Sequence, residues 1–439
     1  MKIGFISLGC CKNRVDSEYV MGILKEAGCS IVTSPREAEV IMVNTCGFIE
    51  PAKEEGINTI LEMAEYKEKT CRKLIVLGCL AKRYKQELQK ELPEVDRFIG
   101  LDEYDQLPEI LNEELGLNVQ SRYGKGKRLI STQPWMAYLK IADGCSNRCT
   151  YCAIPLIRGD YVSFPLEDLI TEAQWLASQG VKELVLIAQD TTRYGIDLYG
   201  ERRLKDLLIQ LNQIEGLHWI RILYMYPDEI DDALIQTMKD CSKVLPYFDI
   251  PVQYGEDHML QLMNRRGSVE DIKSIIRKIR ATFTMPVLRT TIIVGFLQET
   301  EQRFEQLLDF VKEIKWDRLG AFIYSSEEDT PAYSMLGEVE ESIQKERYQK
   351  LMTLQETIAK EKGQQLIDQV LEVLIENQDG LTGRYRGRSV HSAPDGIDGT
   401  IYFTSDKKLT YGTFVQVMIT RVEGHDYFGV AIFEKEKAE

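Results

Sequence analysis

Three cysteines are crowded into one short stretch near the middle of the chain. The segment DGCSNRCTYC places Cys145, Cys149 and Cys152 in a C-x3-C-x2-C arrangement. Thiolates this close in one loop can surround a soft metal centre such as an iron–sulfur cluster. No fourth Cys or His follows at the spacing of a closed structural zinc site. Three protein ligands on an iron–sulfur cube would leave one iron open. Zinc ligation and a chance grouping are the alternatives.

A second set of three cysteines is spread over the first 80 residues. Cys10 follows GFISLG, Cys46 follows VIMVNT and Cys79 follows LIVLG, so each comes directly after a predicted buried strand. In open α/β sheets the carboxyl ends of parallel strands meet at one edge, where ligands bind. We therefore expect these cysteines to meet at one point. The alternative is that they are small buried hydrophobes, as we interpret Cys29, Cys71 and Cys241; Cys11 receives no role.

The elements that position the first set of cysteines belong to a run of alternating strands and helices. Six strands are predicted, at 136–144, 183–190, 220–227, 247–252, 287–295 and 318–325. Six β/α units are too few for a closed eight-fold barrel and predict a partial (β/α)6 barrel. We assign this domain to residues 131–361, and it includes a charged helix after Pro331 with Leu351, Leu354 and Ile358 on one side.

The flanking segments predict two further domains. Short apolar runs at 2–9, 39–45 and 73–78 alternate with amphipathic stretches, which indicates a Rossmann-like parallel α/β domain over residues 1–117. The last part of the chain has five strand-like runs separated by Gly and Asp turns. It predicts a small antiparallel β-barrel over residues 364–435. The fold class is therefore α/β, with a β-barrel at the carboxyl end.

The net charge and the apolar runs limit the partners and the compartment that the sequence predicts. The chain of 439 residues has a formal net charge of −15, which does not favour nucleic acid as the partner. No apolar run approaches the length of a membrane span, and the amino terminus has no cleavage site typical of a signal peptide. We expect a cytoplasmic protein that does not contact a membrane.

The C-x3-C-x2-C spacing, with an aromatic residue before the last Cys, resembles the radical S-adenosylmethionine (SAM) superfamily. Tyr151 occupies that aromatic position. The resemblance implies a 4Fe–4S cluster whose open iron chelates SAM and whose electron cleaves it to a 5′-deoxyadenosyl radical. Gln189 and Arg289, which we expect at strand ends of the barrel, are candidates for holding SAM. Alternatively, Gln189 caps a strand and Arg289 forms a buried ion pair.

A further resemblance covers nearly the whole chain. SLGCCKNRVDSE, VNTCGFI and GCLAKRY are similar to the amino-terminal domain of the methylthiotransferases, which precedes a radical SAM core and a TRAM barrel. The resemblance implies that Cys10, Cys46 and Cys79 hold a second 4Fe–4S cluster. It also implies a reaction that replaces C–H with C–S–CH3 and consumes two SAM molecules, together with a sulfur donor and an electron donor such as flavodoxin or ferredoxin.

Three stretches resemble the RimO-type branch of that family. They are AQDTTRYG at 188–195, RILYMYPDEI at 221–230 and GRSVHSAPDGIDGTIY at 387–402. The resemblance implies that the substrate is ribosomal protein uS12, methylthiolated at the β-carbon of one aspartate. The twelve acidic and eight basic residues from Leu366 onward fit a basic protein partner better than tRNA. The alternative is a tRNA adenosine methylthiotransferase. Leu297-Gln298 and Tyr254-Gly255 depart from the family pattern.

Overall fold

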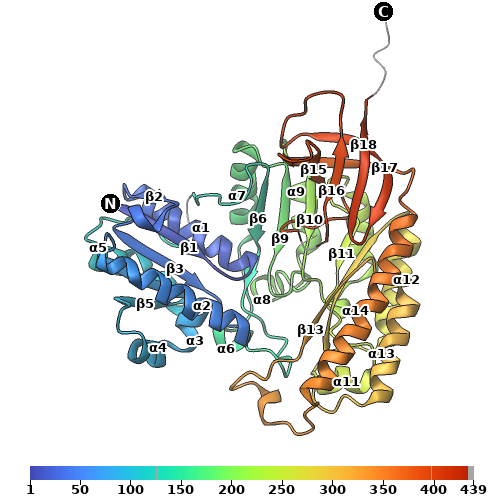
Figure 1. Ribbon diagram of the computed structural model, residues 1–439, viewed down its shortest axis with the longest axis horizontal. Helices are drawn as coiled ribbons and strands as arrows, with labels where there is room; N and C mark the ends of the chain where they lie inside the picture. Colours follow the sequence, from blue (N-terminus) through green and yellow to red (C-terminus); the bar gives the residue numbers. More distant parts are fainter. Residues whose placement is uncertain (125–126, 397, 434–439) are drawn as a thin grey trace, which may run out of the picture.

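The computed structural model describes residues 1–124, 127–396 and 398–433. Three domains follow one another along the chain (Figure 1). The first, in blue, lies beside the central domain in green and yellow, and the third, in red, packs against the same core of central-strand residues as the first. No described helix is long and apolar enough to cross a membrane.

The N-terminal domain is a five-stranded parallel sheet in the order β2-β1-β3-β4-β5. The three predicted strands form its centre, and the prediction missed the two edge strands, which have only three and four residues. Helices α1 and α5 cover one face of the sheet, and α2, α3 and α4 cover the other. The strands are β1 (Lys2–Ser7), β2 (Ser30–Val32), β3 (Val40–Thr45), β4 (Lys73–Gly78) and β5 (Arg97–Gly100), and the helices are α1 (Cys11–Glu26), α2 (Glu50–Ala64), α3 (Cys79–Arg83), α4 (Lys85–Glu91) and α5 (Leu107–Leu115).

The central domain contains the six predicted parallel strands. They form two three-stranded sheets, β6-β9-β10 and β11-β12-β13, joined by a bridge between Ile220 and Val244. The strands are β6 (Met136–Lys140), β9 (Glu183–Ile187), β10 (Trp219–Ile222), β11 (Tyr247–Asp249), β12 (Val287–Val294) and β13 (Arg318–Ile323), with β7 (Ala142–Asp143) and β8 (Val162–Ser163) as a short extra pair. The helices are α6 (Ile154–Arg158), α7 (Leu166–Ser178), α8 (Ile196–Tyr199), α9 (Leu204–Asn212), α10 (Asp232–Asp240), α11 (Asp257–Leu262), α12 (Val269–Thr282), α13 (Glu301–Ile314) and α14 (Glu341–Gln364).

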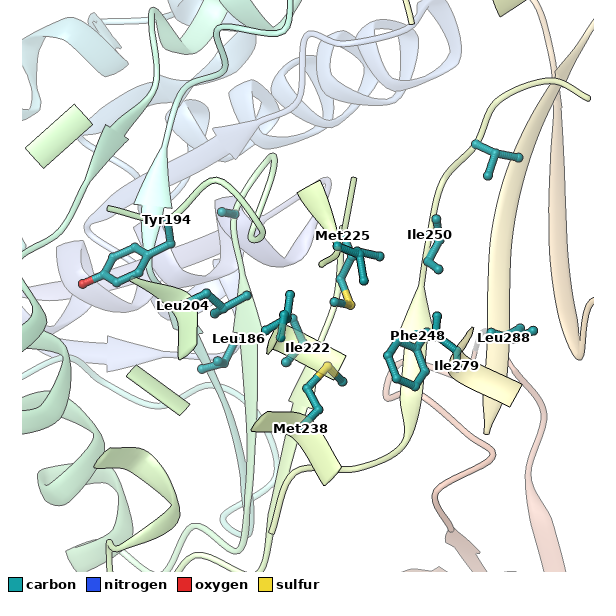
Figure 2. Close-up of a cluster of buried hydrophobic side chains, with 14 of the residues drawn as sticks. Leu186, Tyr194, Leu204, Ile222, Met225, Met238, Phe248, Ile250, Ile279 and Leu288 are labelled. Atoms are coloured by element: carbon teal, nitrogen blue, oxygen red, sulfur yellow. The ribbon is translucent and has the colours of Figure 1, made fainter. Parts of the chain in front are cut away.

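Each face of these central strands has its own apolar core. Between the strands and the outer helices, Leu186, Ile222 and Phe248 meet Met238 and Ile279 (Figure 2). The inner face packs against the other two domains instead. That second core contains central-strand residues together with two residues of α1 and two of the C-terminal domain: Tyr138, Val185, Tyr247, Val287, Val15, Tyr19, Leu374 and Ala393. The neighbouring domains thus cover the inner face of the partial barrel.

The C-terminal domain is a closed five-stranded barrel in the order β14-β15-β16-β18-β17. Its strands are β14 (Val370–Gln378), β15 (Tyr385–Arg388), β16 (Ile401–Thr404), β17 (Phe414–Glu423) and β18 (Asp426–Ile432). The pair β16–β18 is parallel. The other four strand pairs are antiparallel, so the predicted antiparallel barrel is confirmed apart from this one pair, in which β18 lies between β17 and β16. The predicted domain end at 435 lies outside the described residues.

Candidate active site

The first cysteine set, the core triad (Cys145, Cys149 and Cys152), lies in the loop after β6 and β7. The loop begins at Gly144, which has a φ of +70° and lies so close to Asp160 that a Cβ would come within 2.0 Å of its carbonyl oxygen. The Cys145 amide donates to Gly159 O at 3.0 Å, and Thr150 Oγ1 donates to Leu262 O at 2.8 Å. The loop is therefore pinned at both ends to the barrel.

Two side chains from other elements surround Cys149. Tyr226 Oη lies 3.1 Å from Cys149 Sγ, and Arg265 Nη1 lies 3.6 Å from the same sulfur. The Arg265 guanidinium also stacks 3.9 Å from the centre of the Tyr226 ring. No carboxylate pairs with Arg265 among the described residues, so its positive charge faces the sulfur. A guanidinium placed in this way stabilises a thiolate.

The thiols of the core triad lie in an apolar setting. Burial raises the pKa of Cys145 to about 11. Burial also raises the pKa of Cys152, and the neighbouring Cys149 and Cys145 add to this effect. Thiols of this kind stay protonated unless a metal displaces the proton, and a coordinated thiol is deprotonated outright. Three thiols of one loop, with a guanidinium beside Cys149, fit the donor set of an iron–sulfur cluster.

The second set, the N-terminal triad (Cys10, Cys46 and Cys79), lies at the ends of three adjacent strands. Cys46 follows β3 directly, Cys79 follows β4 directly, and Cys10 follows β1 after a short turn. The register pairs Ser7 with Asn44 and Thr45 with Gly78, so the three strands end level with one another. The predicted meeting of the strand ends is confirmed.

Close backbone approach brings the N-terminal triad together. A Cβ on Gly9, whose φ is +86°, would lie 2.8 Å from the Cβ of Cys46. Asn13 donates to Thr45 O at 3.0 Å, while its Oδ1 lies 3.4 Å from Cys79 Sγ and 3.9 Å from Cys10 Sγ. Burial raises the pKa of Cys79 to about 12, and the nearby Arg158 opposes that rise. This donor set also fits a cluster.

Neither triad forms a compact site for a single ion. Among the described residues, no three His, Cys, Asp or Glu side chains converge closely enough to hold one metal ion. A cube places its thiolate ligands on different irons and so keeps them farther apart.

Arg158 joins the two triads. It ends α6, six residues after Cys152, and its Nη2 donates to Asn13 Oδ1 at 2.6 Å and to Asp16 Oδ2 at 2.8 Å. The same nitrogen lies 3.6 Å from Cys79 Sγ. Nη1 donates to Asp143 Oδ1 at 2.9 Å. One guanidinium thus contacts the N-terminal triad, the helix behind it and the loop that carries the core triad.

A second connection runs through the segment after β10. Tyr224 Oη lies 3.5 Å from the sulfur of Cys11, the neighbour of Cys10. Tyr226, two residues later, contacts Cys149. This short segment therefore connects the neighbour of Cys10 with a member of the core triad.

Comparisons with known proteins agree with this arrangement. Residues 2–100 match the family model described as Uncharacterized protein family UPF0004, residues 139–311 match the Radical SAM superfamily, and residues 367–432 match the TRAM domain. The chain is 47% identical to the ribosomal protein uS12 methylthiotransferase RimO of Acetivibrio thermocellus, with 99% of each chain covered. The proteins of the same name from Clostridium botulinum, with 98% of each chain covered, and Clostridioides difficile, with 99%, are also 47% identical.

The chain belongs to the RimO-type methylthiotransferases. It is therefore a radical SAM methylthiotransferase, and membership of the radical SAM superfamily implies a 4Fe–4S cluster and SAM. Solved structures share the fold at low identity. The radical SAM methyltransferase TsrM of Kitasatospora setae has a TM-score of 0.56 at 12% identity and covers 75% of this chain and 76% of its own. The cobalamin-dependent radical SAM enzyme OxsB has a TM-score of 0.51 at 13% identity and covers 82% of this chain and 56% of its own.

The candidate SAM contacts of this methylthiotransferase have different surroundings. Gln189 follows β9 as predicted, and its buried Oε1 has no hydrogen-bond partner among the described residues. Tyr151 packs edge-on against Phe296, with the two ring centres 6.4 Å apart. Arg289 is the third residue of β12, so its predicted place at a strand end was wrong. It pairs with Asp249 at 3.3 Å and Asp398 at 3.6 Å, which is the buried ion pair we considered as an alternative.

Sequence reasoning missed several residues that this methylthiotransferase places around its cysteines. Arg158 and Arg265 belong to no motif that would have assigned them a role, and Asn13 lies in SLGCCKNRVDSE, where the sequence drew attention only to Cys10. Tyr226 lies in RILYMYPDEI, where the sequence indicated only the family branch. The position of Arg158 could have indicated a role, because Arg158 comes shortly after a cysteine loop at the end of a parallel strand. Such a residue lies at the edge of the sheet where ligands bind.

Proposed function

We propose that this chain adds a methylthio group to the β-carbon of an aspartate in ribosomal protein uS12. Relatives that bear this activity in their names match it over 98% or more of its length. The observation that carries the proposal is that the two cysteine triads are connected, through Arg158 and through the segment with Tyr224 and Tyr226. A reaction that removes hydrogen and then adds sulfur at one carbon needs two such centres close together.

We further propose that each triad holds one 4Fe–4S cluster with an open iron. The core triad belongs to the domain over 131–361 and the N-terminal triad to the domain over 1–117, with the TRAM barrel proposed over 364–435. When bound, the core cluster supplies the electron that cleaves SAM, and the N-terminal cluster supplies sulfur for transfer.

The residues of the chain orient the reactants. Gln189 Oε1 is an unused acceptor beside the barrel and would accept a hydrogen bond from the amino group of SAM. The Arg265 and Tyr226 side chains hold Cys149 and keep water from its sulfur. Arg158 fixes the separation of the two triads, because its contacts join both domains in one buried network.

The proposed partners are uS12, free or in the small subunit, a sulfur donor, and an electron donor such as flavodoxin or ferredoxin. All of them occur in the cytoplasm, which we propose as the place of reaction. A tRNA substrate is the alternative.

The test uses anaerobically reconstituted enzyme incubated with uS12, SAM and a low-potential reductant. Mass spectrometry of the uS12 peptides should show one methylthio group on an aspartate. tRNA nucleosides from a parallel reaction should remain unmodified. Methylthio-adenosine in the tRNA arm with unchanged uS12 would establish the alternative substrate instead.

A further inference from the structure

Lys12 is buried although its side chain carries a charge. It is 6% exposed, and none of the salt bridges among the described residues includes it. Its ammonium instead lies 3.0 Å from the centre of the Tyr224 ring. Lys140, the other buried lysine of the described chain, pairs with both Asp16 and Asp143. Because a buried ammonium without an anion is unfavourable, Lys12 weakens the folded state of the free chain.

The place of Lys12 on its helix adds to this cost. It is the second residue of α1, whose first turn contains no acidic side chain. The amino end of a helix carries partial positive charge and repels a cation there. Residues that break several local rules are expected at functional sites. The same helix end and the same ammonium would together attract an anion.

Tyr224 holds the Lys12 ammonium in place. This tyrosine has a φ of +60°, which is strained for a bulky residue. Its backbone is fixed on both sides, because its amide donates to Asp249 Oδ2 at 2.9 Å and its carbonyl accepts from the Thr191 amide at 3.0 Å. The ring thus presents its face to Lys12 and supplies a partial substitute for an anion.

The ammonium lies where the two triads approach one another. Lys12 follows Cys10 by two residues, and the ring that it contacts belongs to the segment whose next tyrosine touches Cys149. Under the proposed function, the target carbon must reach this region, since it loses hydrogen on the side of the core triad and receives sulfur on the side of the N-terminal triad. The β-carbon of aspartate is bonded directly to its carboxylate carbon. A cation that binds the carboxylate therefore also positions the reacting atom.

We propose that Lys12 binds the carboxylate of the substrate aspartate and selects this side chain over its amide. The inference rests on the proposed function and extends it to the residue that recognises the substrate. An adenine base offers no carboxylate, so the same charge would have no partner in a tRNA substrate.

The test compares uS12 carrying aspartate at the target position with uS12 carrying asparagine there. The enzymes are the wild type, Lys12→Met, Lys12→Arg and, as a matched control, Lys25→Met, which removes an exposed lysine from the same helix. Loss of one partner of a buried charge pair lowers kcat/KM by at least about 30-fold. We expect Lys12→Met to lose that factor on the aspartate substrate only, Lys12→Arg to recover part of it, and Lys25→Met to match the wild type.

Three further measurements separate substrate recognition from other roles. Lys12→Met should bind aspartate-bearing uS12 more weakly, keep the electron paramagnetic resonance spectra of both clusters, and unfold at a temperature no lower than the wild type. An unchanged aspartate-to-asparagine preference in Lys12→Met would overturn the proposal, and altered spectra with that preference kept would assign Lys12 to the cluster instead. A wild-type enzyme that modifies only tRNA would overturn the proposed function and this inference together.

Discussion

Replacing Arg158 by methionine tests whether one guanidinium holds the two halves of the site together. The methionine keeps the unbranched, apolar part of the side chain but removes the donors to Asn13, Asp16 and Asp143. The Arg158 side chain is 2% exposed and that of Asp16 is 1% exposed, so the lost ion pair is a buried one. Although burial alone would raise it, the pKa of Asp143 is lowered by Arg158 and Lys140.

The expected magnitude follows from what remains after the substitution. Removing one partner of a buried ion pair costs about 3–5 kcal/mol. Lys140 still pairs with Asp16 and, at 2.8 Å, with Asp143. We therefore expect a cost near the lower limit, about 3 kcal/mol, which lowers the unfolding temperature by about 3 °C in a chain of this size.

The assay is thermal unfolding of cluster-free protein kept reduced and anaerobic. Arg158→Lys should recover part of the loss, because an ammonium restores the charge but has one nitrogen, whereas the guanidinium uses Nη1 for Asp143 and Nη2 for Asn13 and Asp16. Arg277→Met is the matched control, since that arginine pairs with Glu270 while 62% exposed, and its loss should cost below about 1 kcal/mol. If Arg158→Met unfolds at the same temperature as Arg277→Met, the buried network does not join the domains as described.

Three other changes give separable outcomes. Cys46→Ala should retain SAM cleavage but yield no methylthiolated product, whereas Cys149→Ala should lose both activities. Liquid chromatography of 5′-deoxyadenosine measures SAM cleavage, and mass spectrometry of uS12 measures methylthiolation. Equal losses of both activities in the two variants would contradict separate roles for the triads. Tyr226→Phe removes the hydroxyl 3.1 Å from Cys149 Sγ and should lower the reduction potential of the core cluster by about 40 mV, because a hydrogen bond of about 1 kcal/mol to the more negatively charged, reduced cluster is lost. Potentiometric titration measures this potential. An unchanged potential would show that the hydroxyl does not donate to the sulfur. Burial, followed by Arg318, Arg221 and Lys362, lowers the pKa of His391 to about 3. The unfolded chain therefore takes up a proton below about pH 6.5 that the folded chain does not, which costs about 1.4 kcal/mol of stability at about pH 5.5. His391→Gln should remove this loss, measured as the difference in the free energy of unfolding between about pH 7.5 and about pH 5.5. The same difference in the wild type and in His391→Gln would refute this explanation.

The predictions from sequence succeeded where a local pattern carries the information. The six central strands and the level ends of β1, β3 and β4 follow from apolar runs of strand length between amphipathic helices. Short edge strands such as β2 and β5 carry too few residues for such a pattern. Arg289 illustrates the limit for the site, since a donor in a strand looks the same whether it faces a ligand or the carboxylates of Asp249 and Asp398.

The sequence by itself determined which thiols are grouped, because cysteine spacing and strand-end placement are properties of neighbouring residues. Only the tertiary structure decided how the two groups face one another. Arg158, Tyr224 and Tyr226 make contacts with residues 75 or more positions away, and no local pattern specifies such partners. The burial of Lys12 without an anion was likewise decided by tertiary packing, since whether a lysine reaches water depends on the elements packed around it.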